Sequence, residues 1–217
     1  MDKKKIYVFL GLKTTGKDFS SKPYIEMGYK KIAFADPLRD MCWKILGYQP
    51  NEDLSYEDLK KSVLSTEKQA QLFGKRIPWF NSYKITSIRQ MLQNIGSLMK
   101  EKFGADYWAN IWKQSVLASD SNVVCTDCRF PNEIKKALSL TKNGYEVVFK
   151  WCCYENADFT TILADTHESE ALAQFIYWNQ SKYNLSDGST ISTQQIKTII
   201  KDFEKFQSSK EKLDNLF

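Results

Sequence analysis

The sequence predicts an α/β fold in which helices flank a five-stranded parallel sheet. Short runs of apolar, β-branched and aromatic residues recur along the chain, and such runs are typical of strands buried on both faces. Helical patterns separate these runs, and this alternation is typical of a parallel sheet. The expected strands cover residues 6–10, 31–35, 123–126 and 146–151, with a weaker fifth at 182–185.

The clearest helical pattern begins near residue 86 or 87. Its apolar face consists of Ile88, Met91, Leu92, Ile95, Leu98 and Met99. A neighbouring stripe of the same helix carries Arg89, Gln93, Gly96 and Lys100. A stripe of cationic and amide side chains predicts either a helix that lines an anion pocket or a solvated flank.

The last helix is marked by its start. Ser192 and Gln195 form a capping box ahead of an apolar stripe, and the tail after Gln207 is expected to fray. Pro23 is expected to shorten or break an earlier helix that begins near residue 17. Residues 49–85 have the composition of an inserted excursion of helices and loops.

Composition narrows the function classes. The 217 residues suit one main domain, and 31 basic against 26 acidic residues give a net charge of +5. This small excess does not favour a dedicated nucleic-acid binder but suits an anionic small molecule. The arginines that could supply a planar guanidinium are Arg39, Arg76, Arg89 and Arg129.

Location and redox state follow from two further features. No apolar run is long enough for a signal peptide or a membrane span, so a cytoplasmic protein without membrane contact is expected. The five cysteines are an odd number, which favours reduced thiols. Cys125 and Cys128 form a CxxC that Cys152 and Cys153 could complete as a zinc site. However, residues three apart on a strand face opposite sides of the sheet and cannot bind one metal ion, so a zinc site is not expected.

The sharpest motif follows the first expected strand. It reads Gly11, Leu12, Lys13, Thr14, Thr15, Gly16, Lys17, Asp18 and has the G-x-x-x-x-G-K pattern of a phosphate-binding loop. In such a loop the glycines let backbone amides surround phosphate oxygens, and the lysine neutralises their charge. A plain glycine turn between strand and helix is the alternative reading.

The residue after the motif lysine departs from the usual pattern. Asp18 stands where a serine or threonine usually ligates Mg²⁺. A carboxylate is also a hard oxygen ligand, so Asp18 is a candidate metal ligand, and Thr14 and Thr15 add hydroxyls within the loop.

A second constellation follows the strand expected at residues 123–126. Asp127 and Arg129 emerge at the carboxyl end of this strand, where ligands of open α/β sheets bind. Asp127 is a candidate carboxylate for Mg²⁺, and Arg129 can grip a phosphate through two parallel hydrogen bonds. The alternative is an ion pair between the two residues that fixes the loop.

Several segments together resemble a known family. They are GLKTTGKD, IAFADPLRD, RQMLQNIGSLMKEKFGADYWA, VVCTDCRFPNE, HESEA and NLSDGST. In order and spacing they resemble the deoxynucleoside monophosphate kinases of bacteriophages, which have the P-loop nucleoside monophosphate kinase fold. The resemblance extends over most of the chain, and its most specific segments are the loop ending in GKD and the stretch around RFPNE.

The resemblance implies that ATP, with Mg²⁺, phosphorylates a deoxynucleoside 5′-monophosphate. Gly11, Lys13, Thr14, Thr15, Gly16, Lys17 and Asp18 would bind ATP, and Lys17, Asp18 and Arg129 would act in catalysis. The residues that would bind the acceptor are Asp36, Arg39, Arg89, Gln93, Lys100, Trp108, Asp127 and Arg129. Asp18 and Asp127 would serve Mg²⁺.

The resemblance also implies an organisation for residues 1–217 as a single kinase domain. The core would comprise about 1–48 and 116–217, with an acceptor-binding helical region at about 49–115 and a lid at about 153–170. His167 is the one basic side chain expected in that lid. The expected partners are small molecules, not nucleic acid or membrane, and a homodimer stays open. The alternatives are a kinase of the same fold for another phosphorylated metabolite, and a non-catalytic, ATP-dependent binding module.

Overall fold

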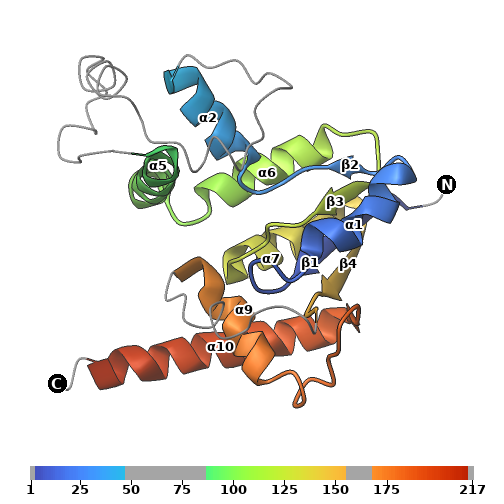
Figure 1. Ribbon diagram of the computed structural model, residues 1–217, viewed down its shortest axis with the longest axis vertical. Coiled ribbons are helices and arrows are strands. Elements are labelled where there is room, and N and C mark those ends of the chain that lie inside the picture. Colours follow the sequence, from blue (N-terminus) through green and yellow to red (C-terminus); the bar gives the residue numbers. More distant parts are fainter. Residues whose placement is uncertain (1–2, 47–86, 155–167, 215–217) are drawn as a thin grey trace. The chain divides into compact units, whose positions relative to one another are not determined.

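The chain divides into two compact units, each with its own core (Figure 1). The computed structural model describes residues 3–46, 87–154 and 168–214. Unit 1 comprises Met1–Phe34 and Trp112–Phe217, and unit 2 comprises Ala35–Ile111. The excursion expected at 49–85 lies outside the described residues, as do most of the expected lid and His167.

Unit 1 is built on a five-stranded mixed sheet that is mostly parallel. Its strands are β1 (Lys5–Leu10), β2 (Lys30–Lys31), β3 (Val123–Cys125), β4 (Glu146–Trp151) and β5 (Thr190–Ile191). They are arranged in the order β2-β3-β1-β4-β5. β1 is central and pairs in parallel with β3 and β4, so that Val8 lies opposite Cys125 and Phe149. The α/β class expected from the alternating pattern is confirmed.

The expectation of a purely parallel sheet is wrong at the fifth strand. Residues 182–185 form turns, in which the amide of Leu185 donates to the carbonyl of Gln180 over 2.9 Å. Tyr183 and Leu185 lie in these turns, and their side chains are buried. The chain then returns at the carboxyl end of β4, where the amide of Gly188 donates to the carbonyl of Trp151. β5 therefore enters the sheet from that end and runs antiparallel to β4.

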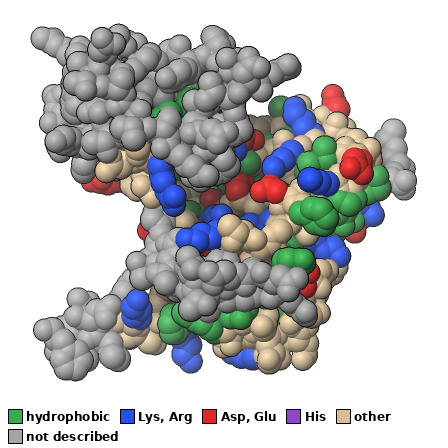
Figure 2. Space-filling model, viewed as in Figure 1, with side chains coloured by type: hydrophobic (Ala, Val, Ile, Leu, Met, Phe, Trp, Pro, Cys, Tyr) green, Lys and Arg blue, Asp and Glu red, His purple; other side chains and the backbone are tan. Residues whose placement is uncertain are grey.

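Helix α1 (Lys17–Glu26) covers one face of the sheet. Tyr24 packs on Tyr7 of β1 with ring centroids 4.3 Å apart. The helix continues through Pro23 and ends three residues later, so the proline does not break it. Helix α1 leaves the apolar side chains of Phe19 and Ile25 exposed, and Met27 is exposed just after it. Figure 2 shows hydrophobic side chains at the surface of this part of unit 1.

The C-terminal part of unit 1 supplies further helices. They are α7 (Pro131–Ser139), the 3₁₀ turn η1 (Leu140–Asn143), α9 (Glu168–Trp178) and α10 (Thr193–Asp214). α10 packs against β4 and α9. The capping box is confirmed, because the amide of Ser192 donates to Gln195 Oε1 over 2.9 Å and the amide of Gln195 donates to Ser192 Oγ over 3.2 Å. The expectation of a frayed tail after Gln207 is wrong, since α10 runs on to Asp214.

Unit 2 contains α2 (Asp36–Leu46), α5 (Ile88–Phe103) and the start of α6 (Tyr107–Leu117), whose later turns belong to unit 1. Ser87 caps α5 by accepting the amide of Gln90 over 3.2 Å. The apolar face expected for α5 is buried at Ile88, Met91, Leu92, Ile95 and Met99. Leu98, expected on the same face, is half-buried. No helix in the described ranges is both long and apolar enough to cross a membrane.

The strand order creates a place for a ligand in unit 1. From β1 the chain moves outward through α1 to β2, whereas from β3 it crosses β1 through α7 to reach β4. The connections that follow β1 and β3 thus leave in opposite directions. In open α/β sheets, ligands bind beyond the carboxyl ends of the strands at such a switch point. The segments at residues 11–16 and 126–130 follow these two strand ends.

Gly11 lies where β1 ends against the chain that follows β4. The amide of Cys152 donates to the carbonyl of Leu10 over 2.8 Å. A Cβ atom on Gly11 would lie 2.3 Å from the carbonyl oxygen of Cys152 and 2.8 Å from Thr15 Oγ1. The neighbour at 2.3 Å is backbone, so no side-chain rotation can relieve the clash. Only glycine fits this position.

We expect Gly11→Ala to lower the free energy of unfolding by about 3 kcal/mol or more, because the added methyl group must push the backbone apart. Gly188→Ala is the matched control, since Gly188 also has a positive φ of 74° but has nothing within 4 Å of the added Cβ. That variant should lose only the about 1–2 kcal/mol of left-handed strain. Urea unfolding of both variants measures the difference, and equal losses would contradict the steric argument.

Candidate phosphate-binding site

The loop at residues 11–16 joins β1 directly to the N-terminus of α1. Thr15 Oγ1 donates to the carbonyl of Leu12 over 2.8 Å, which holds the loop in a tight turn. Thr14 and Gly16 both have positive φ, of 61° and 83°. Because the first amides of a helix have no partner within the helix and carry its positive dipole end, this arrangement favours an anion.

Lys17 is the first residue of α1, and only 6% of it is exposed. Its Nζ donates to the carbonyl of Gly11 over 2.8 Å and also to the carbonyl of Leu12. The pKa of Lys17 is lowered to about 8, mainly by burial and also by the nearby charge of Arg129, whereas the carboxylate of Glu170 opposes the change. An anion bound beside Lys17 would stabilise its ammonium form.

Asp18 connects α1 to the ends of two strands. Its Oδ1 accepts from Thr126 Oγ1 and from Lys31 Nζ, both over 2.7 Å. Burial opposes ionisation of Asp18, but the hydrogen bonds from Lys31 and Thr126 outweigh it, and the pKa of this carboxyl lies below its usual value. Asp18 is therefore ionised and lies beside the carboxyl end of β3.

Asp127 has a different set of contacts from Asp18. Its Oδ1 accepts the backbone amide of Phe34 over 2.8 Å and lies 3.4 Å from Cys125 Sγ, which can donate to it. The Asp127 carboxylate thereby attaches the segment after β2 to the end of β3. Trp112 attaches the same segment from the other direction, since its ring stacks on Phe34 and its indole N–H donates to the carbonyl of Ile32 over 3.0 Å.

Arg129 pairs with Glu170, and not with the Asp127 suggested by the ion-pair reading of the sequence. Arg129 Nη1 donates to Glu170 Oε1, while Glu170 Oε2 accepts the backbone amide of Lys13 over 3.0 Å. The backbone of Arg129 is held separately, because Glu133 Oε2 accepts its amide over 2.6 Å and the amide of Phe130 over 3.0 Å. The structure thus brings Lys13, Lys17, Arg129 and Glu170 together.

Several of these contact residues were not among the candidates from sequence, Glu133 of the RFPNE stretch among them. Glu170 lies in the segment HESEA, which resembles the kinase family, but no local pattern indicates that its carboxylate reaches the loop. Thr126 could have been chosen as the hydroxyl at the end of a buried strand. Lys31 is one lysine of a lysine-rich chain, and nothing in the sequence separates it from the others.

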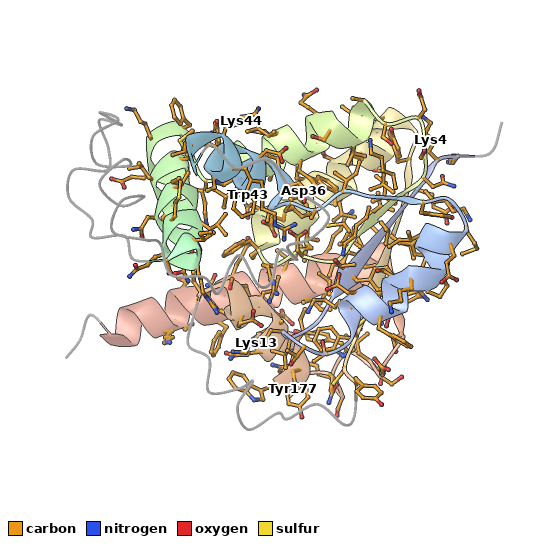
Figure 3. All side chains as sticks on the ribbon, turned by 45° about the horizontal axis from the view of Figure 1, so that its top comes forward. Lys4, Lys13, Asp36, Trp43, Lys44 and Tyr177 are labelled. Carbon is orange, nitrogen blue, oxygen red and sulfur yellow. The ribbon has the colours of Figure 1, made fainter. Side chains whose placement is uncertain are left out.

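The remaining candidates lie in unit 2. Asp36 and Arg39 form an ion pair on α2, with Arg39 Nη1 2.9 Å from Asp36 Oδ1. Figure 3 shows Asp36 on α2 together with Trp43 and Lys44 of the same helix. On α5 the side of Arg89 and Gln93 is exposed, and Lys100 is half-buried.

Trp108 has a packing role within unit 2. It is 7% exposed and belongs to the core cluster formed with α5. Its indole N–H donates to the carbonyl of Gly96 over 3.0 Å, and Leu38 lies 3.3 Å from the position of a Cβ on Gly96. The contact of Trp108 with a substrate stays a prediction.

Unit 1 contains oxygen atoms that could bind the Mg²⁺ implied by the resemblance. Within the described ranges no three His, Cys, Asp or Glu residues cluster as a metal site. Mg²⁺ at a nucleotide site commonly takes one or two protein oxygens and obtains the rest from phosphates and water. Asp18 and Thr126 supply such a pair of oxygens 2.7 Å apart, next to the phosphate loop. These two residues fit the ion. Asp127 accepts the amide of Phe34 through its Oδ1, just as Asp18 accepts from Thr126 and Lys31 through its own Oδ1, and Asp127 stays a candidate ligand.

The chain was compared with known proteins. No family model matches it, and no curated protein sequence matches it.

The Lys17 pKa of about 8 predicts how anion binding depends on pH. Below pH 8 the ammonium form is already present, and a bound polyphosphate raises its pKa towards the ordinary value. ATP affinity should therefore fall above pH 8, by up to about tenfold per pH unit, and binding at pH 8 should take up about half a proton. Calorimetry in two buffers of different ionisation enthalpy measures this uptake.

Lys17→Arg is the control, because a guanidinium stays charged over this pH range. The variant should bind ATP with little pH dependence between pH 7 and pH 9.5. An equal decline in the variant and the wild type would assign the titration to another group.

Proposed function

We propose that the protein transfers the γ-phosphoryl group of ATP to a deoxynucleoside 5′-monophosphate, giving ADP and the diphosphate. The observation that carries this proposal is the phosphate loop with its buried Lys17, which Arg129 faces from the end of the next strand in the sheet. A second cation beside the loop can stabilise the charge of a phosphoryl group in transfer. The choice of a deoxynucleotide acceptor rests on the family resemblance.

In this proposal the loop amides and Lys17 hold the phosphates of ATP. Phosphoryl transfer needs alignment and charge neutralisation more than covalent chemistry from the protein. An acceptor phosphate oxygen attacks the γ-phosphorus, and the bond from this phosphorus to the β–γ bridging oxygen breaks. Arg129 stabilises the charge that is spread over the γ-phosphoryl oxygens.

Asp18 and Thr126 are the proposed protein ligands of Mg²⁺, which when bound would neutralise phosphate charge during transfer. Lys31 at present shares the Asp18 carboxylate. Because Lys31 is 43% exposed, it can move into solvent and give up that oxygen at little cost.

Asp36, Arg39, Arg89, Gln93, Lys100 and Trp108 are proposed for the acceptor side. This assignment comes from the resemblance, as does the P-loop kinase fold with a lid. The Asp36 carboxylate orients Arg39, which supports it, whereas the exposure of Arg89 and Gln93 on α5 agrees with both alternatives for that stripe.

We expect a coupled ADP-release assay over the four deoxynucleoside and four ribonucleoside monophosphates to show turnover with a deoxynucleotide. Lys17→Met should abolish it, because the variant keeps the aliphatic stem but loses the charge on the phosphates. Lys22→Met on the same helix is the matched control, since Lys22 is exposed, and it should keep full activity. A melting curve is needed, because loss of the Lys17 ammonium leaves the carbonyls of Gly11 and Leu12 without this donor.

A folded wild type that binds ATP but phosphorylates none of the eight acceptors would contradict the proposal. Turnover with only a non-nucleotide phosphate ester would favour the other metabolite kinase. ATP binding without any acceptor would favour the binding module.

Arg89→Lys should raise the acceptor KM, or lower kcat, by about 10 to 100-fold, equivalent to about 1.4–2.7 kcal/mol. The lysine keeps the charge but loses the planar fork that grips a phosphate. ATP affinity measured without acceptor should hardly change, and the melting temperature should stay the same because Arg89 is exposed. Weakened ATP binding with an unchanged acceptor KM would remove Arg89 from the acceptor side.

A further inference from the structure

Glu170 is a buried carboxylate at the phosphate loop. Only 5% of its side chain is exposed, although it lies in the first turn of α9. Oε2 accepts the amide of Lys13, and Oε1 accepts Nη1 of Arg129. One side chain therefore joins the loop after β1 to the arginine after β3.

The position of Glu170 has a physical cost and a compensation. A buried carboxylate loses several kcal/mol of hydration free energy unless its oxygens are paired. Here one oxygen has a charged partner and the other a backbone amide. The pair also acts on Lys17, whose pKa Arg129 lowers and Glu170 raises, so both groups lie within electrostatic reach of the phosphate-neutralising lysine.

The guanidinium of Arg129 is held in a way that suits a phosphate ligand. Glu133 fixes the backbone of Arg129, and Glu170 fixes one nitrogen of its head group. About 24% of the side chain remains exposed. A guanidinium carries five N–H donors, so contact with Glu170 through Nη1 does not consume its capacity to donate.

We propose that Glu170 is a positioning residue that aims Arg129 at a phosphate held by the loop. For its effect on turnover this inference rests on the proposed kinase function, but its effect on phosphate binding does not. The reading that competes with it makes Glu170 an occupant of the anion site, which a bound phosphate must displace from the amide of Lys13.

The experiment is a double-mutant cycle that uses Glu170→Gln and Arg129→Lys in the full chain. Glutamine keeps the size of the side chain and an acceptor for Lys13, but loses the charge that holds Arg129. If Glu170 acts through Arg129, the two changes are strongly non-additive. Glu168→Gln is the matched control, because it removes the same charge from an exposed position in the same turn of α9.

The first readout is the affinity for inorganic tripolyphosphate, which needs neither an acceptor nor catalysis. We expect Arg129→Lys to weaken binding about tenfold in the wild-type background and less than about twofold in the Glu170→Gln background. An equal effect of Arg129→Lys in both backgrounds overturns the inference. Tripolyphosphate binding that becomes tighter in Glu170→Gln, with the Arg129 effect unchanged, also overturns it and supports the occupant reading.

The second readout is turnover with the best deoxynucleotide. Glu170→Gln should lower kcat about 10 to 100-fold, since small misplacement of a catalytic group has effects of this order, and the double variant should stay within about threefold of Arg129→Lys alone. A double variant whose loss equals the product of the single losses overturns the inference. Coupling in tripolyphosphate binding without turnover in the wild type would sink the kinase proposal and leave the Glu170 inference standing.

The melting temperatures of the variants distinguish a positioning role of Glu170 from a packing role. If Glu170→Gln does not fold, Glu170→Asp replaces it in the cycle, because aspartate keeps the charge but shortens the reach to Arg129. The coupling with Arg129→Lys should then be partly retained. A loss of function that follows the loss in melting temperature, with additive effects in the cycle, overturns the inference.

Discussion

The burial of one ammonium group constrains the whole loop at residues 11–16. Lys17 is nearly inaccessible, so its charge must find acceptors within the protein, and the carbonyls of Gly11 and Leu12 supply them. The chain can turn these carbonyls inward only if it bends sharply after β1. That bend brings Gly11 against the backbone of Cys152, where no side chain fits. The glycine, the turn and the lysine are thus parts of one arrangement.

The sheet determines which side chains surround this lysine. Because β1 pairs in parallel with both β3 and β4, the three strands end at the same edge. Asp18 meets Thr126 there, and Arg129 follows a few residues later. Carboxylates hold this edge together at several points, among them Asp18 to Thr126, Asp127 to Phe34 and Glu170 to Lys13. The proposed anion site is consequently framed by acidic residues, each of which is engaged by donors.

Local patterns predicted the elements that are long or clearly capped. β4 has its expected bounds, α5 begins after Ser87, and Ser192 with Gln195 starts α10. The two shortest strands could not be predicted: β2 covers Lys30–Lys31 and not the expected 31–35, and Thr190–Ile191 is too short to show a pattern. The apolar residues Tyr183 and Leu185 misled the prediction, since turn residues can be buried as well as strand residues. The direction of β5 depends on the edge of the sheet to which α9 and the following turns lead the chain. This is a tertiary property.

In the candidate site, too, the features that are local in sequence could be predicted, whereas contacts between distant segments could not. The loop at 11–16 is contiguous in sequence, so its motif reveals it, and Arg129 stands out because arginines are scarce. The partner of Arg129 is 41 residues away along the chain, and no periodicity links Glu170 to a strand end in another part of the sheet. Asp127 stays a predicted metal ligand by position, and one oxygen of its carboxylate also accepts the amide of Phe34, which no local pattern indicates. Contacts between distant segments are decided by which donors remain unpaired once the sheet has formed. A sequence motif can therefore name the groups that meet a phosphate more readily than the groups that hold them in place.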